Sequence, residues 1–395
     1  MSENTSKIVR LGVLGCGGRM RGILKRLLET DTENQIRIIS AFDPFPESLN
    51  SLREITGYDF ATASTEDAVI DNPEVDWIFI GSWNSHHSRQ VVRAMNAGKD
   101  IFCEKPMATT FEECLAIRDA SEKFGRTFSL GLVLRYSAHY AKLKEILESG
   151  RIGKIISMEF NETLSFNHGG YIFGNWRRLR ENAGTHLLEK CCHDIDLINW
   201  LLGSVPVRAA SFGGKDFFTP ENAYRRDELG QNKDGLVAYE AWPDPQRVDP
   251  FDEKADIFDN QVAILQYANG VRATFHTNCQ AAICERRIYF VGTHGALRAD
   301  LVTGKIEVAN IGWDEKIETI DTNVSDGHGG GDNIMSQALL RTLLHQEKPL
   351  ASVREGLCSS IAVFGIDQAA DESTVVDLSP LWEKVNINPY TVFQE

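Results

Sequence analysis

The chain has 395 residues, a length that favours two domains, each with a core of its own. Its net charge of −15 argues against a nucleic-acid-binding surface and favours a small-molecule ligand. No segment is long and apolar enough to span a bilayer, and the first residues run from a short polar stretch into an apolar one, so we expect a cytoplasmic protein. The eight cysteines have no metal-ligand spacing, so we expect reduced thiols and no metal site.

A glycine-rich turn separates the first predicted strand, residues 8–14, from the first predicted helix. In this strand–turn–helix context, Gly15 permits the tight turn and Gly17 lets the backbone approach a pyrophosphate. The helix N-terminus that follows supplies free N–H groups and a positive dipole. Met20 stands where Gly or Ala is usual, so we expect the helix to lie slightly further from the strand.

The second predicted strand, residues 36–42, ends at Asp43 and Pro44. A carboxylate at that point accepts hydrogen bonds from both ribose hydroxyls of NAD and repels the 2′-phosphate of NADP. The pattern therefore favours NAD over NADP. The alternative is that Asp43 only forms a turn before the proline.

Further predicted strands at 75–80, 100–103 and 127–130 alternate with helices, which predicts a parallel, doubly wound sheet and a Rossmann domain over residues 1–130. The strand at 100–103 ends at Glu104 and Lys105, and the ligand crevice of such a sheet lies outside the carboxyl ends of its strands. Pro106 holds Lys105 out of helical backbone angles, so that its ammonium can be aimed at a substrate oxygen. The alternative is that the strand simply ends in water.

The remaining residues, 131–395, predict a substrate-binding α+β domain with a large, open, mainly antiparallel sheet. Apolar and polar residues alternate in several segments, and Asn269-Gly270 predicts a type I′ hairpin turn. We expect helices at 184–202, 333–346 and 353–371 to cover one face of this sheet. For the polar insertion at 217–259, a lid, an arm that contacts another subunit and a disordered segment all stay open.

Glu189 and His193 are four residues apart in the helix predicted at 184–202. A carboxylate–imidazole pair at this spacing orients a general base, and the alternative is a surface pair on an amphipathic helix. Further along, the glycine-rich run at 327–332 predicts a hinge, from which His328 could reach a substrate.

The order and spacing of these motifs resemble the Gfo/Idh/MocA oxidoreductases, the family of glucose–fructose oxidoreductase and inositol dehydrogenase. The resemblance covers nearly the whole chain and rests on residues 15–19, Asn84, His87, 97–106, Arg135, 153–154, 176–177, 193–196 and 200–203. This chain departs from the family pattern at Glu189, where most members carry Asp. It also departs at Cys191, where Gly is usual, and at Trp83, where Pro is usual.

The resemblance implies an NAD-dependent dehydrogenase that transfers hydride between a nicotinamide and a secondary alcohol of a sugar, sugar acid or cyclitol. It implies that Lys105 steadies the developing alkoxide, that His193 moves the hydroxyl proton, and that Glu189 orients His193 or binds a neighbouring hydroxyl. The cofactor-binding residues that we expect are Gly15, Gly17, Arg19, Met20, Asp43, Ser82, Asn84, His87 and Glu104. The expected substrate wall consists of Arg135, Tyr136, Trp176 and Arg177.

Two other functions known in this family stay open. One is a glycoside-cleaving enzyme that retains and recycles its NAD, and the other is a non-catalytic dinucleotide-binding regulator. Because open sheet faces pair between subunits in relatives, the resemblance also implies a homodimer or homotetramer.

Overall fold

The computed structural model describes residues 8–324 and 327–393, which form two compact units. The first unit consists of the described residues up to Ser137 together with Gly330–Leu357. The second consists of Ala138–Gly329 and the described residues from Cys358 onward. The first unit is therefore discontinuous in sequence, because residues 330–357 belong to it although they follow most of the second unit. Among the described residues, no helix is long and apolar enough to cross a membrane.

The first unit contains a six-stranded parallel sheet, as the alternation of strands and helices predicts. Its strands, in spatial order, are β3 (Ala61–Thr62), β2 (Ile36–Phe42), β1 (Val9–Leu14), β4 (Trp77–Ile80), β5 (Asp100–Cys103) and β6 (Phe128–Leu130). The direction in which strands are added reverses between β1 and β4, and this switch point is where doubly wound sheets bind ligands. The predicted Rossmann fold is confirmed.

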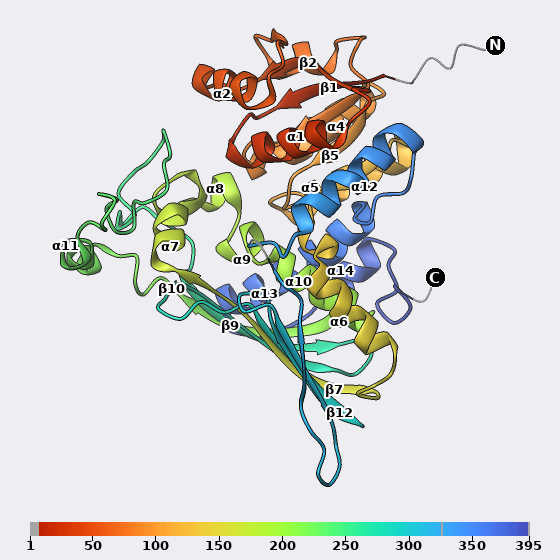
Figure 1. Ribbon diagram of the computed structural model, residues 1–395, viewed down its shortest axis with the longest axis vertical. Helices are drawn as coiled ribbons and strands as arrows, with labels where there is room; N and C mark the ends of the chain where they lie inside the picture. The colour runs from red at the N-terminus through yellow and green to blue at the C-terminus, as the bar shows by residue number, and fades with distance from the viewer. Residues whose placement is uncertain (1–7, 325–326, 394–395) are drawn as a thin grey trace. The chain divides into compact units, whose positions relative to one another are not determined.

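Two groups of helices pack on this sheet (Figure 1). In one group, α1 (Gly18–Thr30) contacts α2 (Pro46–Thr56) and α12 (Gly331–His345). In the other, α4 (His87–Asn96) contacts α3 (Glu66–Ile70) and α5 (Phe111–Phe124). The helix that we expected at 333–346 on the antiparallel sheet is α12, so its predicted place was wrong. Its apolar spacing indicates a buried face but does not specify which partner covers that face.

The second unit contains a nine-stranded sheet, mainly antiparallel as predicted, with one parallel pair between β7 and β10. In spatial order its strands are β14 (Glu318–Asp321), β13 (Lys305–Asn310), β12 (Gly295–Asp300), β11 (Arg287–Gly292), β7 (Ile155–Ser165), β10 (Arg272–Ala281), β9 (Asn260–Tyr267), β8 (Pro206–Gly214) and β15 (Val375–Asp377). The turn between β9 and β10 is not type I′, because Gly270 has a φ of 90° but Asn269 does not have a positive φ. Instead, the Gly270 N–H donates to the Tyr267 carbonyl and closes a turn whose central residues are 268 and 269. Gly270 then follows these two residues in the left-handed conformation.

The helices of the second unit are α6 (Ala138–Glu148), α7 (Phe166–Phe173), α8 (Arg180–Ala183), α9 (His186–Glu189), α10 (Cys192–Leu202), α11 (Tyr224–Leu229) and α14 (Ser379–Lys384), with most of α13 (Val353–Glu372). The insertion at 217–259 shares a hydrophobic core with α7, β7 and β10. Phe218, Tyr239 and Phe251 are buried together with Phe173 of α7. The insertion is therefore folded, which excludes the disordered alternative.

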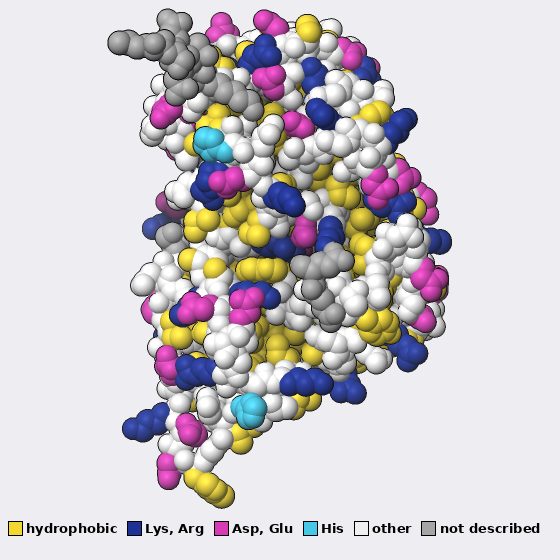
Figure 2. All heavy atoms as spheres, turned by 90° about the vertical axis from the view of Figure 1, so that its right-hand side faces the viewer, with side chains coloured by type: hydrophobic (Ala, Val, Ile, Leu, Met, Phe, Trp, Pro, Cys, Tyr) yellow, Lys and Arg dark blue, Asp and Glu magenta, His cyan; other side chains and the backbone are white. Residues whose placement is uncertain are grey.

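Acidic and basic side chains are interspersed on the face shown in Figure 2, without an extended area of either sign. Nucleic-acid-binding surfaces concentrate Lys and Arg in one stripe or patch. This face carries no such concentration.

Candidate functional site

The glycine turn after β1 has the geometry that a dinucleotide requires. Gly15 has a φ of 80°, and a Cβ there would lie 2.4 Å from the backbone nitrogen of Ser82, so this position accepts only glycine. Gly17 is the N-cap of α1, and a Cβ there would meet no atom within 4 Å. No side chain caps α1, so its first N–H groups are available to an anion. The turn therefore fits a pyrophosphate.

Asp43, at the end of β2, contacts this turn directly. Its Oδ2 accepts a hydrogen bond from the Cys16 N–H at 2.7 Å, and its Oδ1 accepts one from the Phe45 N–H at 2.9 Å. The second bond makes Asp43 the turn former that we considered as an alternative, and the first places its carboxylate beside the glycine turn. Burial raises the pKa of Asp43, although both backbone bonds oppose the rise. Carboxylate lone pairs are left for ribose hydroxyls.

Arg19 and Glu104 form an ion pair in the first unit. The Arg19 Nε donates to Glu104 Oε1 at 3.1 Å, and its Nη1 donates to Asp332 Oδ1 at 2.6 Å. Although burial opposes its charge, these two carboxylates raise the pKa of Arg19. Asp332 lies in the first turn of α12, so the pair also connects α12 to α1. A Cβ at Gly131 would lie 2.8 Å from Glu104 Oε1, so glycine makes room for this carboxylate.

Both ring nitrogens of His87 contact backbone carbonyls of the first unit, and its expected role in cofactor binding stays a prediction. Its side chain is completely buried, with Nδ1 2.8 Å from the carbonyl oxygen of Pro106 and Nε2 3.3 Å from that of Ser82. Burial lowers the pKa of His87, and the shorter contact places the proton on Nδ1, because a carbonyl oxygen only accepts. His87 therefore supports the backbone beside Lys105.

Lys105 follows β5 and is half-buried. Its backbone N–H donates to Glu104 Oε2 at 3.2 Å, and the peptide bond to Pro106 is cis. Because His87 also binds the Pro106 carbonyl, side chains fix the backbone on both sides of the lysine. The predicted position of Lys105 at the carboxyl edge of the sheet is observed.

Other expected cofactor residues have structural partners. Met20 is buried, and a Cβ at Gly81 would lie 2.8 Å from the Met20 Cβ, so this side chain packs under the turn and offers only its backbone to a ligand. The Ser82 hydroxyl donates to Gln90 Oε1 at 2.7 Å. Asn84 is buried at the start of the 3-10 helix Asn84–His86.

Two residues of the expected substrate wall, Arg135 and Tyr136, belong to the first unit and are buried. Burial raises the pKa of Tyr136, while its hydroxyl bonds to the backbone of Leu350. The Tyr136 hydroxyl thus has a partner inside the unit, and the place of Tyr136 in the substrate wall stays a prediction.

The helix predicted at 184–202 is interrupted between Glu189 and His193. Glu189 is the last residue of α9 and His193 is the second residue of α10, with Lys190 and Cys191 between the two helices. The Glu189 carboxylate accepts a bond from Arg177 Nε at 3.0 Å. The two residues therefore do not share one continuous helix as we expected. The role of Glu189, to orient His193 or to bind a neighbouring hydroxyl, stays a prediction. His193 is buried, and its ring centroid lies 6.4 Å from that of His328.

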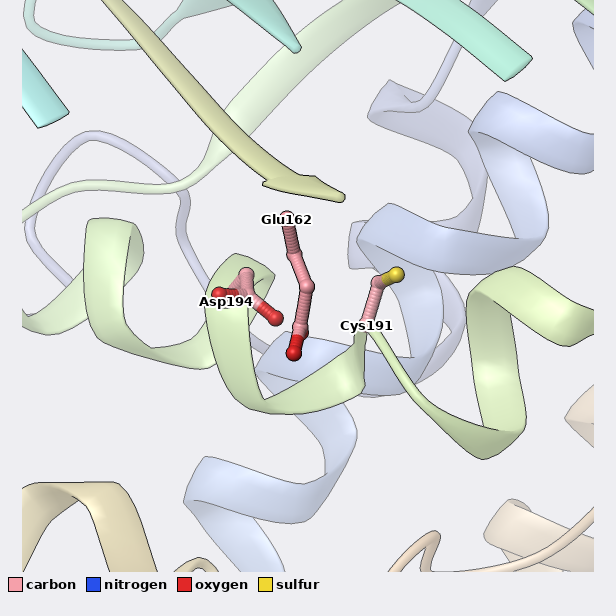
Figure 3. Close-up of side chains that lie close together, drawn as sticks. All are labelled: Glu162, Cys191 and Asp194. Atoms are coloured by element: carbon pink, nitrogen blue, oxygen red, sulfur yellow. The ribbon is translucent and has the colours of Figure 1, made fainter. Parts of the chain in front are cut away.

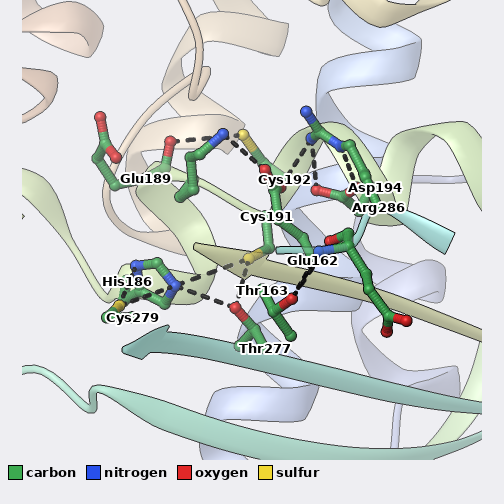
Figure 4. A network of polar contacts seen from close by, with 12 residues as sticks. Glu162, Thr163, His186, Glu189, Cys191, Cys192, Asp194, Thr277, Cys279 and Arg286 are labelled. Atoms are coloured by element: carbon green, nitrogen blue, oxygen red, sulfur yellow. Dashed lines mark hydrogen bonds and ion pairs between the residues drawn. The ribbon is translucent and has the colours of Figure 1, made fainter. Parts of the chain in front are cut away.

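A buried network of charges holds the interruption in place (Figure 4). Lys190 binds Glu162 Oε1 at 2.7 Å, and Arg286 binds Glu162 Oε2 at 2.8 Å. Arg286 also donates two bonds to Asp194, of 2.8 and 2.7 Å. Burial alone would raise the pKa of Glu162, but Arg286 and Lys190 hold it well below its ordinary value. Because Lys190 and Asp194 flank His193, the network fixes the backbone that carries it.

Glu162, Cys191 and Asp194 also lie close enough together to offer ligand atoms to a metal ion (Figure 3). Both carboxylates already bind Arg286, and burial raises the pKa of the Cys191 thiol, which opposes the thiolate that a metal requires. We therefore interpret this group as part of the charge network.

Trp176 and Arg177 lie in the 3-10 helix Trp176–Arg178. The guanidinium carbon of Arg177 lies 4.3 Å from the Trp176 ring centroid and 4.9 Å from that of Tyr171. Arg177 Nη1 also donates to the Tyr171 hydroxyl at 3.1 Å. Arg177 thus stacks on both aromatic rings while it binds Glu189.

Sequence reasoning missed Glu162, Arg286, Asp332 and Tyr171. Glu162, Arg286 and Tyr171 belong to no motif, and Asp332 ends the glycine-rich run at 327–332, which we interpreted as a hinge. One sequence signal could have predicted the charge network. Lys190 and Asp194 lie on either side of His193 in a segment expected to be buried, and buried charges need partners of opposite charge.

Two family models match most of the chain. Residues 9–132 match the oxidoreductase family's NAD-binding Rossmann fold, and residues 144–378 match the C-terminal alpha/beta domain of the same Gfo/Idh/MocA family. The chain belongs to this family. It is an NAD-binding oxidoreductase, as the resemblance implied.

Relatives in sequence include an oxidoreductase of Bacillus subtilis, 22% identical over 79% of this chain and 83% of the relative. The inositol 2-dehydrogenase of Ralstonia nicotianae is 29% identical over 51% of this chain and 56% of its own length. Among solved structures, levoglucosan dehydrogenase with NADH and levoglucosan has a TM-score of 0.77 at 18% identity, over 94% of this chain and 100% of that one. The apo scyllo-inositol dehydrogenase of Lactobacillus casei has a TM-score of 0.72 at 19% identity, over 95% and 99%. These structures share the fold of this chain.

Proposed function

We propose that this oxidoreductase transfers hydride between NAD and a secondary alcohol of a sugar, sugar acid or cyclitol. The observation that carries the proposal is the fixed lysine, Lys105, at the carboxyl edge of the sheet of an NAD-binding domain, in a chain that also keeps His193. Relatives named for inositol and levoglucosan act on cyclic polyols, which supports this substrate class.

Each of the two residues has a distinct role. When bound, NAD supplies the hydride acceptor. Lys105 donates a hydrogen bond to the substrate oxygen and stabilises the negative charge that develops there, and His193 takes the hydroxyl proton. Glu104 and His87 restrict the backbone at Lys105 and so reduce the positions open to its ammonium.

Glu189 contributes to substrate binding. Its ion pair with Arg177 presents a carboxylate and a guanidinium side by side. Together these groups accept and donate hydrogen bonds, which suits the neighbouring hydroxyls of a polyol.

The test is an assay of the purified protein against sugars, inositols and aldonates, with and without added NAD, followed by the absorbance of NADH. We expect NADH with at least one compound only when NAD is added. A panel without any NADH would contradict a freely exchanging dehydrogenase. Product formed without added NAD would instead indicate a retained cofactor.

A further inference from the structure

The ion pair between Arg177 and Glu189 lies in the second unit's part of the candidate site. Arg177 Nε donates to Glu189 Oε1 at 3.0 Å, and the two side chains are only 18% and 10% exposed. Burial opposes the charge of Arg177, yet Glu189 raises its pKa above the ordinary value. Tyr171 and Asp244 act in the same direction. The guanidinium and the carboxylate therefore offset each other's charge.

The other Lys and Arg residues of this segment are paired as well. Residues 171–203, which carry Glu189 and His193, contain four of them. The three besides Arg177 form ion pairs as follows: Arg178 with Asp252, Arg180 with Asp371, and Lys190 with Glu162. Within residues 171–203, no Lys or Arg thus lacks a carboxylate partner.

A histidine near this pair carries no charge either. His168 lies one turn before Tyr171 on α7, and the Tyr171 hydroxyl accepts a hydrogen bond from Arg177 Nη1 at 3.1 Å. Burial and then Lys190 lower the pKa of His168 to about 3, although Glu189 opposes the change. The imidazole is therefore neutral near neutral pH, where it donates one hydrogen bond and accepts another.

A sugar acid would bring a carboxylate into this part of the site. Removing an anion from water is costly unless a group of opposite charge binds it. Arginine suits this purpose because its guanidinium binds both oxygens of a carboxylate. Here, however, Arg177 already binds the carboxylate of Glu189, whose negative charge would repel a second one.

We propose that the Arg177–Glu189 pair selects uncharged polyols, namely neutral sugars or cyclitols, and excludes sugar acids. This inference rests on the proposed function, in which Glu189 contributes to substrate binding, and it narrows the substrate class. Glu189 and His168 accept hydrogen bonds from hydroxyl groups, and Arg177 donates to them. The pair thus recognises hydroxyls without presenting a net charge.

The first experiment compares neutral sugars with their own uronic acids, so that the two members of each set differ in one group. The purified chain is given NAD with glucose or glucuronate, galactose or galacturonate, and mannose or mannuronate, with myo-inositol as a neutral cyclitol. NADH absorbance gives kcat/KM. We expect the best neutral compound to exceed every uronate by at least about tenfold.

A uronate oxidised as efficiently as the best neutral compound would overturn the selectivity while the dehydrogenase function stood. Absence of NADH with every compound would overturn the proposed function and this inference with it.

Glu189→Gln keeps the size of the side chain and removes its charge. Because Arg177 then lacks its carboxylate partner, the ratio of kcat/KM for a uronate to kcat/KM for the neutral sugar should rise about tenfold. General damage to the fold would lower both values and would not raise this ratio. The gain should vanish when Glu189→Gln is combined with Arg177→Gln. Where turnover is too slow to measure, titration calorimetry of the NAD-loaded variant gives the ratio of affinities instead.

Glu307→Gln is the matched control, because it also removes a carboxylate from an ion pair of the second unit, the pair with Arg298 between β12 and β13. Its ratio should equal that of the wild type. An unchanged ratio in Glu189→Gln, or an equal rise in Glu307→Gln, would overturn the role of the Arg177–Glu189 pair.

Discussion

Lys105 is positioned by its neighbours in sequence and by one residue distant in sequence. Glu104 accepts the backbone N–H of Lys105, and His87 binds the carbonyl of the proline that follows. A lysine has four rotatable bonds, so fixing its backbone removes part of the freedom that would otherwise oppose a defined position of the ammonium. Glu104 and His87 thus help to position the Lys105 side chain by holding the backbone around it.

Lys105→Ala should reduce kcat by about two to four orders of magnitude, because the substrate oxygen loses its hydrogen-bond donor and the positive charge beside it. NAD binding, measured by calorimetry, should be retained. Lys123→Ala, an exposed lysine of the same unit, is the control. Near-normal turnover in Lys105→Ala would remove this residue from the mechanism.

His193→Asn tests the proton acceptor. Asparagine keeps polar character at this buried position but does not take a proton at the operating pH, so kcat should fall by about two to four orders of magnitude. The loss of rate toward acidic pH that a protonated base causes should also disappear from the profile of kcat against pH. An unchanged profile would show that another group accepts the proton.

At the scale of elements, the interruption between α9 and α10 is maintained by buried charge. Two cations, Lys190 and Arg286, are opposed by the carboxylates of Glu162 and Asp194. Buried ions are costly unless paired, so the network specifies one arrangement of the chain around His193.

Glu162→Gln should lower the free energy of unfolding by about 3–5 kcal/mol, because the buried Lys190 then loses its carboxylate partner and Arg286 keeps only Asp194. Urea denaturation at constant pH measures the change. Glu159→Gln, on the same strand but with a half-exposed ion pair to Arg287, is the matched control and should lower the free energy of unfolding by less than about 1 kcal/mol. Similar losses in both variants would show that the network does not stabilise the fold.

At the scale of the whole molecule, the first unit is discontinuous in sequence. Residues 330–357 return to it after the second unit has begun, and the Leu130 N–H donates to the Ala351 carbonyl at 3.0 Å. Gly356 packs against Met107, where a Cβ would lie 2.6 Å from the sulfur. The NAD-binding unit is thus completed by residues from near the end of the chain.

Stability across pH should depend on a buried carboxylate of the second unit. Burial raises the pKa of Asp367 to about 7, although Thr185 and Gln261 donate hydrogen bonds to it at 2.5 and 3.2 Å. An unfolded Asp titrates near about 3.9. Between these two pKa values, Asp367 is protonated in the folded state and ionised in the unfolded state. The free energy of unfolding therefore falls by up to about 1.4 kcal/mol for each unit by which the pH rises.

Asp367→Asn removes this titration, so its stability should decline less than that of the wild type between about pH 4 and about pH 7. Urea unfolding at several pH values measures the difference. Glu372→Gln, an exposed position on the same helix, should follow the wild type. Parallel curves for Asp367→Asn and the wild type would contradict the assignment.

The alternation of strands and helices, the glycine turn and Asp43 were sufficient to predict the Rossmann unit. These features are local, because each depends on residues within one strand–turn–helix segment. The alternation of apolar and polar residues in the second half of the chain likewise predicted a mainly antiparallel sheet. The Gfo/Idh/MocA motifs indicated the family and the cofactor.

Tertiary structure alone decided the partners of the charged and aromatic side chains. Glu189 binds Arg177, α12 packs on α1, and both ring nitrogens of His87 contact backbone carbonyls. The physical reason is that sequence periodicity shows which residues are buried, while the identity of a partner depends on which distant segment covers them. For the same reason, only the structure showed that the insertion is folded and packs against α7.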